Sequence, residues 1–238
     1  LTADGGLYML PTNFALYTLI TKEKWCSNKE NFTFEEALRA VRECEEDPMI
    51  SRDLFLQEGA ICGGYSGETE DNRLEQYIKI AEQLPQQAMF QTNDLLMREG
   101  KIPFNLECIG DMQQYLYKKS VWGEDAVYTG AEGNGRIFIF VNCFAINSQS
   151  THKEEAWKFV ESYFTEEGQK TIAPNWNFSI LQDVLDQQLS DSRKQEYYQT
   201  SDGKREKLPI LTYEIGGTYE NVYAAQDEDI QDVREMIN

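Results

Sequence analysis

The chain alternates between short apolar runs and longer segments in which apolar residues recur at helical spacing. Two apolar runs lie within residues 7–22, on either side of Pro11-Thr12-Asn13, and predict two strands or one strand that enters a crossover. The run at 104–109 predicts a strand, and residues 111–118 after it predict a helix. Residues 126–129 predict a further short strand.

The stretch from Arg136 to Gln169 contains the longest apolar run and a helix signal directly after it. Ile137–Ile146 has the length and the β-branched and aromatic content of a buried strand. A helix is expected over 153–173, with Glu154 and Glu155 in its first turn, where carboxylates suit the positive end of a helix. These segments together predict a strand–loop–helix unit of an α/β domain.

Helical periodicity predicts several more helices along the chain. Thr33 is the expected N-cap of a helix from Phe34 to about Glu45, because Glu36 three residues on completes a capping box. The remaining helices are expected at 53–60, 72–84, 92–98, 179–189, 191–200 and 227–237. Alternating strands and helices favour an α/β sheet domain.

The composition is that of a globular chain with an acidic surface. The 238 residues are 41% hydrophobic and 12% aromatic, which suits one large core or two modest ones. The net charge of −19 argues against nucleic-acid binding, which needs a basic surface, and against a polybasic membrane contact. No run of about 18 apolar residues predicts a membrane span, and Leu1–Asp4 lacks the features of a signal peptide.

Residue types that carry catalytic or metal chemistry form no distinctive motif. A Ser-His-Asp triad would have to use His152, which lies in a charged helix start and is expected in solvent. The loop Gly63–Gly67 lacks the Lys-Ser/Thr of a phosphate-binding loop. The five cysteines show no metal-ligand spacing, and Cys108 and Cys143 are expected to be buried thiols. The sequence therefore predicts neither a cofactor nor a metal.

Four stretches of the chain carry a resemblance to a known family. The most informative one runs Ala145-Ile146-Asn147-Ser148, then Glu155-Ala156-Trp157-Lys158-Phe159, then Glu166, Glu167 and Gln169. The other three are Gly6–Pro11 with Leu16–Lys22, Phe32–Ala37, and Gly123–Gly130 with Gly133–Gly135. In this order they resemble the family-1 extracellular solute-binding proteins, the mostly carbohydrate-binding receptors of ABC importers.

The resemblance implies a periplasmic-binding-protein-like fold of type II, here mainly the C-terminal lobe with the first lobe largely missing. Residues 1–238 are then a single α/β region made of one lobe plus crossover segments, with 125–173 as the segment that can belong to the other lobe. It also implies a carbohydrate ligand held without catalysis by hinge closure, and ABC permease subunits as partners. The location implied is extracellular, with a lipoprotein anchor in an N-terminal part that this sequence does not contain.

The resemblance also implies where ligand would bind. Family contacts fall after the proline matched by Pro11 and at the strand-to-helix junction matched by Ile109-Gly110-Asp111-Met112, while sugars need aromatic faces near such groups. Trp25 and Trp157, by contrast, lie on element faces and are expected in the core. The candidate ligand contacts, expected on one concave surface, are Thr12, Asn13, Phe14, Gly110 and Asp111, with Trp122 or Trp176 at its edge.

Two other classes of protein stay open from the residues alone. One is an α/β hydrolase-like enzyme domain that acts on a carbohydrate, since 41 acidic residues offer many carboxylate pairs. The other is an interaction module without a small-molecule site. A clustered nucleophile or acid pair would favour the enzyme.

Overall fold

A computed structural model describes residues 2–3, 6–7, 9–44, 75, 78–79, 81–83, 94–130, 136–172 and 177–238. The predictions for 53–60, for the loop Gly63–Gly67 and for most of 72–84 lie outside the described residues. Trp176 lies outside them as well.

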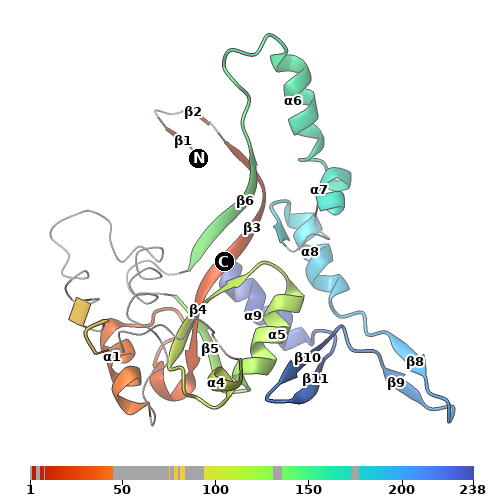
Figure 1. The fold of residues 1–238 in the computed structure, drawn as a ribbon. Coiled ribbons are helices and arrows are strands. Elements are labelled where there is room, and N and C mark those ends of the chain that lie inside the picture. The colour runs from red at the N-terminus through yellow and green to blue at the C-terminus, as the bar shows by residue number, and fades with distance from the viewer. Residues whose placement is uncertain are drawn as a thin grey trace.

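The longest strand, β3 (Leu10–Lys22), organises the main sheet (Figure 1). Its C-terminal half pairs on one edge with β4 (Phe104–Ile109) and on the other with β5 (Ala126–Thr129), and both partners are antiparallel. Its N-terminal half pairs in the same way with β6 (Ile137–Phe144) and β7 (Phe178–Ser179). The bounds of β4 and β5 are those that the sequence predicts.

The residues around Pro11-Thr12-Asn13 predict either two strands or one strand that enters a crossover, and the structure has one. A single strand, β3, runs through these residues, because Pro11 is its second residue and proline is tolerated near the start of a strand. Before it, β1 (Thr2–Ala3) pairs antiparallel with β2 (Gly6–Leu7) in a separate two-stranded sheet.

Helices pack on this sheet to form the main core. They are α5 (Met112–Trp122), α9 (Asp227–Ile237), α1 (Phe34–Glu43), α4 (Asp94–Arg98) and the short 3-10 helix η1 (Glu23–Trp25). The core is rich in aromatic side chains, which each remove a large apolar area from water. Its fully buried members include Trp25, Trp122, Tyr115, Leu16, Ile20 and Ile109.

The start of α1 confirms the capping box read from the sequence. The Glu36 backbone N–H donates to Thr33 Oγ1 over 3.1 Å, and the Thr33 N–H donates to Glu36 Oε2 over 2.9 Å. Glu36 also accepts from the Ser27 N–H over 2.7 Å, so its carboxylate joins the helix start to the preceding loop. Although partial burial acts against ionisation, these hydrogen bonds hold the pKa of Glu36 below its usual value.

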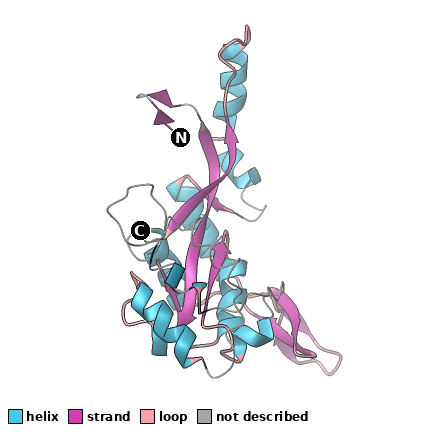
Figure 2. Ribbon diagram, turned by 60° about the vertical axis from the view of Figure 1, so that its left-hand side comes forward, coloured by secondary structure: helices cyan, strands magenta, loops and turns pink. Residues whose placement is uncertain are grey.

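The predicted helix over 153–173 is two helices, α6 (Lys153–Ser162) and α7 (Glu166–Ile172). Thr165 starts the second one, because its Oγ1 accepts a hydrogen bond from the Gly168 N–H over 3.0 Å. Helix α6 stands away from the rest of the protein (Figures 1 and 2). Trp157 is therefore 47% exposed, and the expectation that it belongs to the core is wrong, whereas Trp25 is fully buried as expected.

The predicted helix over 191–200 is also wrong. Helix α8 (Gln182–Asp191) ends where that helix was expected to begin, and β8 (Tyr197–Gln199) then forms a hairpin with β9 (Arg205–Lys207). The turn contains Asp202-Gly203, with Gly203 at φ 82°, and Asp-Gly is a hairpin signal. A second hairpin follows, from β10 (Leu211–Ile215) and β11 (Thr218–Val222).

Two of the cysteines differ from expectation. Cys108 is exposed and Cys143 is half-buried, while Cys26 is buried. An apolar run does not make each of its residues buried, because alternate side chains of a strand point to opposite faces. Among the described helices, none has the length and apolar content that a bilayer span requires.

Candidate functional site

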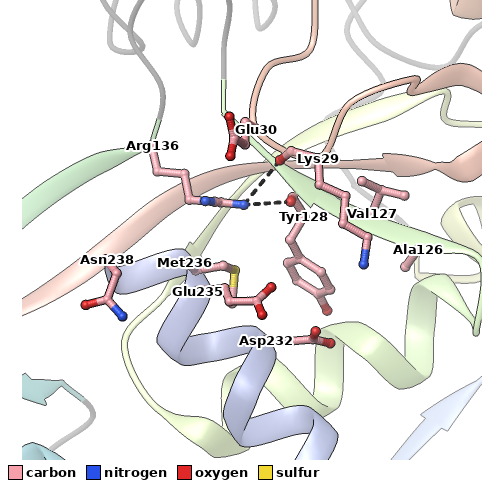
Figure 3. A pocket seen from close by; sticks show the side chains of 10 residues that line it. All are labelled: Lys29, Glu30, Ala126, Val127, Tyr128, Arg136, Asp232, Glu235, Met236 and Asn238. Atoms are coloured by element: carbon pink, nitrogen blue, oxygen red, sulfur yellow. Dashed lines mark hydrogen bonds between the residues drawn. The ribbon is translucent and has the colours of Figure 1, made fainter.

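A cavity of about 360 Å³ lies between β5, α9 and the connection from η1 to α1 (Figure 3). Polar and charged side chains dominate its wall, with one aromatic ring and one thioether among them. The lining residues are Lys29, Glu30, Ala126, Val127, Tyr128, Arg136, Asp232, Glu235, Met236 and Asn238.

Arg136 supplies the guanidinium of this cavity. Its Nη2 donates to the carbonyl oxygen of Tyr128 over 2.9 Å and to that of Lys29 over 3.3 Å, which fixes the side chain between β5 and the η1–α1 connection. Its Nε is buried and has no hydrogen-bond partner among the described residues. Burial lowers the pKa of Arg136, but an arginine keeps its charge at neutral pH.

Two of the cavity carboxylates lie on α9, and a third, that of Glu30, lies on the η1–α1 connection. Asp232 and Glu235 are three residues apart, so they lie on one face of the helix, and Figure 3 shows both beside the Tyr128 ring. Asp232 accepts a hydrogen bond from the Tyr115 hydroxyl over 2.8 Å. Burial raises the pKa of Tyr128 well above its usual value, so its hydroxyl stays a neutral donor.

The cavity offers convergent donors and acceptors in a concave site. A guanidinium and an ammonium, together with the carboxylates of the cavity, can hydrogen-bond a polar, hydroxylated small molecule. Within the described ranges, no group of three or more His, Cys, Asp and Glu residues is arranged to hold a metal ion. His152, the N-terminal flank of α6, is exposed as the sequence predicts.

Three of the sequence-predicted ligand residues lie inside the protein. Thr12, Asn13 and Phe14 are buried in β3, between β6 and β7. The open surface expected there is corrected to a packed one, because strands pair along both edges of β3. Phe14 packs against Phe138 and Phe178, with 5.6 Å between ring centroids in each pair.

A buried polar network surrounds Thr12 and Asn13. Thr12 Oγ1 donates to the Asn142 carbonyl oxygen over 3.0 Å, and Gln169 Nε2 donates to the Thr12 carbonyl oxygen over 2.9 Å. Ser179 Oγ donates to Gln169 Oε1 over 2.6 Å. Asn13 is 1% exposed, and its Nδ2 has no partner among the described residues. The network ties β3 to β6, α7 and β7.

Gly110 and Asp111 directly follow β4. Strand β4 ends at Ile109, which pairs with Leu16, whereas Phe14 pairs with Phe178 of β7. Asp111 caps α5 by accepting from the Gln114 N–H over 2.7 Å, and the Gly110 N–H donates to Gln114 Oε1 over 2.7 Å. Burial raises the pKa of Asp111. The edge of β3 that pairs with β4 is the one opposite β5.

Trp122 does not lie at the edge of a ligand surface. It is fully buried at the last position of α5, at the other end of that helix from Asp111, so its ring cannot stack on a sugar in this conformation. The prediction for Trp176 stays a prediction because that residue is outside the described ranges.

The cavity residues were not found by sequence reasoning. Tyr128 and Arg136 flank a glycine-rich segment, and Asp232 and Glu235 share one face of a predicted helix, but no motif joins these positions. Only the pairing of β5 with β3 and the packing of α9 bring them together.

The chain matches no family model and no curated protein. Among solved structures it is similar to an ABC transporter solute-binding protein from Thermotoga lettingae TMO bound with alpha-D-tagatose, with 13% identity and a TM-score of 0.46. The match covers 79% of this chain and 58% of that one, so this chain spans less than two thirds of that protein's length. At this level of similarity the match assigns neither ligand nor partner to this chain.

Proposed function

We propose that this chain is part of the solute-binding protein of an ABC importer, that its ligand is a carbohydrate and that it catalyses no reaction. The observation that carries the proposal is the ribbon formed by β3 and β6. Their pairing runs from Leu10 opposite Phe144 to Tyr17 opposite Ile137. Strand β3 includes Leu16–Lys22, one of the stretches that resemble the solute-binding family, and β6 ends directly before another, which starts at Ala145. The two strands are more than 100 residues apart in sequence.

Two such crossover strands are what the resemblance implies between two lobes. Here β4, β5, α5 and α9 pack around one end of the ribbon, while α6 stands at the other end (Figure 1). We assign the first group to the C-terminal lobe and part of 125–173 to the other lobe. Exposed apolar side chains on β6 and α6 support this assignment, because a surface of this kind is normally covered: Phe138, Phe140, Trp157 and Phe159.

The proposed ligand groups come from the cavity. Arg136 and Lys29 can donate to sugar hydroxyls, and Asp232 and Glu235 can accept from them. Gly110 and Asp111 do not line the cavity, and they stay in the proposal as separate contacts from the start of α5. Thr12 and Asn13 are assigned to holding the ribbon together. In the full-length protein, the extracellular location, the lipoprotein anchor and the permease partner belong to the same proposal.

Calorimetric titration of the purified chain with a panel of mono- and oligosaccharides tests this function. We expect binding of at least one sugar, weakened about tenfold or more by R136Q or D232N, because a buried polar group left without its partner weakens binding strongly. The matched control is D183N on the exposed face of α8, which should leave binding unchanged.

Two results would contradict the proposal. Hydrolysis of a glycoside, lost when one Asp or Glu is replaced, would favour the carbohydrate-hydrolase alternative. Sugar binding that R136Q and D232N leave unchanged would move the ligand out of the cavity.

A further inference from the structure

The β8–β9 hairpin projects from the body of the protein as an isolated two-stranded ribbon (Figures 1 and 2). All residues of both strands are exposed. The register pairs Tyr197 with Lys207, Tyr198 with Glu206 and Gln199 with Arg205. Neither strand of the hairpin pairs with a described strand of the main sheet.

The hydrogen bonds of the ribbon show which backbone groups point outward. The Leu208 N–H donates to the Glu196 carbonyl oxygen and the Thr200 N–H to that of Lys204, each over 2.8 Å. Hydrogen-bonded and non-hydrogen-bonded pairs alternate in an antiparallel ladder, so the pairs of Tyr197 with Lys207 and Gln199 with Arg205 are non-hydrogen-bonded. The N–H and C=O groups of Arg205 and Lys207 therefore face away from β8, along the outer edge of β9.

The side chains of the same two residues carry cations on one face of the ribbon. The Arg205 guanidinium lies 4.2 Å from the centroid of the Tyr197 ring, and Lys207 Nζ lies 5.9 Å from that of Tyr223. Neither cation has a carboxylate within ion-pair distance among the described residues, whereas Lys204 pairs with Asp202 over 2.7 Å. Contact with the rings holds both cations in place without neutralising them.

The local charge is opposite to that of the whole protein. Residues 193–207 contain five Lys and Arg against three Asp and Glu, a net charge of +2, in a chain of net charge −19. A strand rises about 3.3 Å per residue, so the turn at Asp202 lies on the order of 20 Å beyond Gln195. The Debye length in physiological salt is about 8 Å, so the charges of the ribbon itself set the field near its end.

We propose that the outer edge of β9 is a docking site for an extended, acidic segment of another protein, which adds to the ribbon as a third strand. Backbone hydrogen bonds to Arg205 and Lys207 supply the pairing. Because side chains on one face of a strand recur every second residue, the segment needs acidic residues at alternate positions, next to the two cations.

The charges on and around the ribbon favour an acidic protein segment over two other possible occupants, a second copy of the chain and an anionic membrane. A second copy of the chain pairing edge to edge would set the Arg205 and Lys207 cations of one ribbon beside those of the next, and like charges on adjacent strands repel. Each basic residue near an anionic membrane contributes only about 1 kcal/mol to binding. The rest of this protein is strongly negative, so an anionic membrane would also repel it.

The test is a fluorescence-anisotropy titration of the whole chain with two labelled seven-residue peptides of identical pattern, Thr-Glu-Val-Glu-Thr-Glu-Val and Thr-Lys-Val-Lys-Thr-Lys-Val. We expect the glutamate peptide to bind, with affinity falling as salt rises, and the lysine peptide not to bind. Backbone amides of Arg205 and Lys207 should become protected from hydrogen exchange on binding, because they enter the new ladder.

Matched variants separate docking from general charge. R205E and K207E should each weaken the glutamate peptide about threefold and together about tenfold, the range of exposed ion pairs. K204E makes the same charge change on the turn, beside Asp202 rather than on the β9 edge, and should leave affinity within about twofold. The double variant should bind the lysine peptide instead, which also shows that its hairpin is folded.

The backbone part of the proposal has its own variant. K207P removes an outward-facing N–H, which an edge strand tolerates, together with the Lys207 cation. K207E keeps the N–H and should weaken the glutamate peptide only about threefold, whereas K207P should abolish its binding. Absence of glutamate-peptide binding to the unaltered chain would overturn the proposal. It would also fail if R205E/K207E bound as tightly as the unaltered chain, or if phosphatidylserine vesicles bound the chain while the glutamate peptide did not.

Discussion

The hydroxyl of Tyr115 on α5 donates to a carboxylate oxygen of Asp232 on α9 over 2.8 Å, and so joins the two helices behind the cavity. The Tyr115 ring also packs against the Tyr128 ring of β5 in a tilted arrangement, with 5.0 Å between centroids. Burial, followed by the hydrogen bond to Asp232, raises the pKa of Tyr115 far above its usual value, so the hydroxyl remains a donor. One side chain thus positions an acidic wall residue and a ring of the cavity.

Y115F removes this hydrogen bond and keeps the ring. Hydrogen bonds to charged groups contribute about 1.5–3 kcal/mol, so we expect Y115F to lower the free energy of unfolding by that amount in urea denaturation. Sugar affinity should fall as well, because Asp232 loses its orientation. The control is Y198F, whose hydroxyl donates to Glu206 on the exposed ribbon and which should change stability by less than about 0.5 kcal/mol.

Asp111 predicts a pH dependence. Burial raises its folded pKa above the ordinary value of 3.8, so the protonated form is favoured in the folded protein. The contribution of Asp111 to the free energy of unfolding is therefore greatest below pH 3.8 and declines as pH rises through the interval up to the raised folded pKa.

D111N removes this titration and keeps a good N-cap, so its stability relative to the unaltered chain should increase as pH rises through that interval. D111A removes the cap to Gln114 and should lose about 1 kcal/mol. Urea denaturation of the three proteins between pH 3 and pH 7 measures both effects. A stability difference between D111N and the unaltered chain that falls as pH rises would show that the pKa of Asp111 is lowered.

Asn142 interrupts the β3–β6 ribbon. It adopts φ 54° within β6, and the register shows pairs on both sides of it but none between it and Thr12. Asparagine tolerates this left-handed backbone and a β-branched residue does not. N142V should therefore cost about 1–3 kcal/mol of unfolding free energy, whereas N142G should stay within about 0.5 kcal/mol. Equal stability of the two variants would show that the left-handed conformation is not required.

Much of the main sheet could be predicted because local pattern and final structure agree there. The run at 104–109, the strand at 126–129, the Thr33 capping box and the helix at 227–237 all stand as the sequence indicates. In these segments periodicity and capping chemistry act within a few residues. Tertiary packing then reinforces the same choice.

The predictions that are wrong concern residues whose structure depends on contacts far along the chain rather than on local pattern. The helix expected over 191–200 has acceptable helical composition, yet the Asp202-Gly203 turn beyond its end makes a hairpin of Tyr197–Lys207. Thr12 and Asn13 are polar, and polarity suggests a surface, but strand pairing on both edges of β3 buries them among other polar groups. The cavity joins residues about a hundred positions apart, which no local pattern encodes.

The apolar side chains on β6 and α6 predict self-association. Phe140 is 45% exposed and Phe159 58%, and an exposed apolar surface is stabilised when another surface covers it. We expect the chain to form dimers or larger species in sedimentation velocity at tens of micromolar. The double variant F140S/F159S should shift it toward monomer, because it removes two aromatic contacts of about 1–3 kcal/mol each.

The matched control for this double variant is Y219S on β11. Tyr219 is 74% exposed, more than either phenylalanine, yet it lies on a different part of the protein, so its loss should leave the sedimentation profile unchanged. Equal effects of Y219S and F140S/F159S would mean that association follows total exposed aromatic area rather than this surface. A chain that is monomeric at every concentration would show that the β6–α6 surface does not drive self-association and would weaken its assignment as the face of a second lobe.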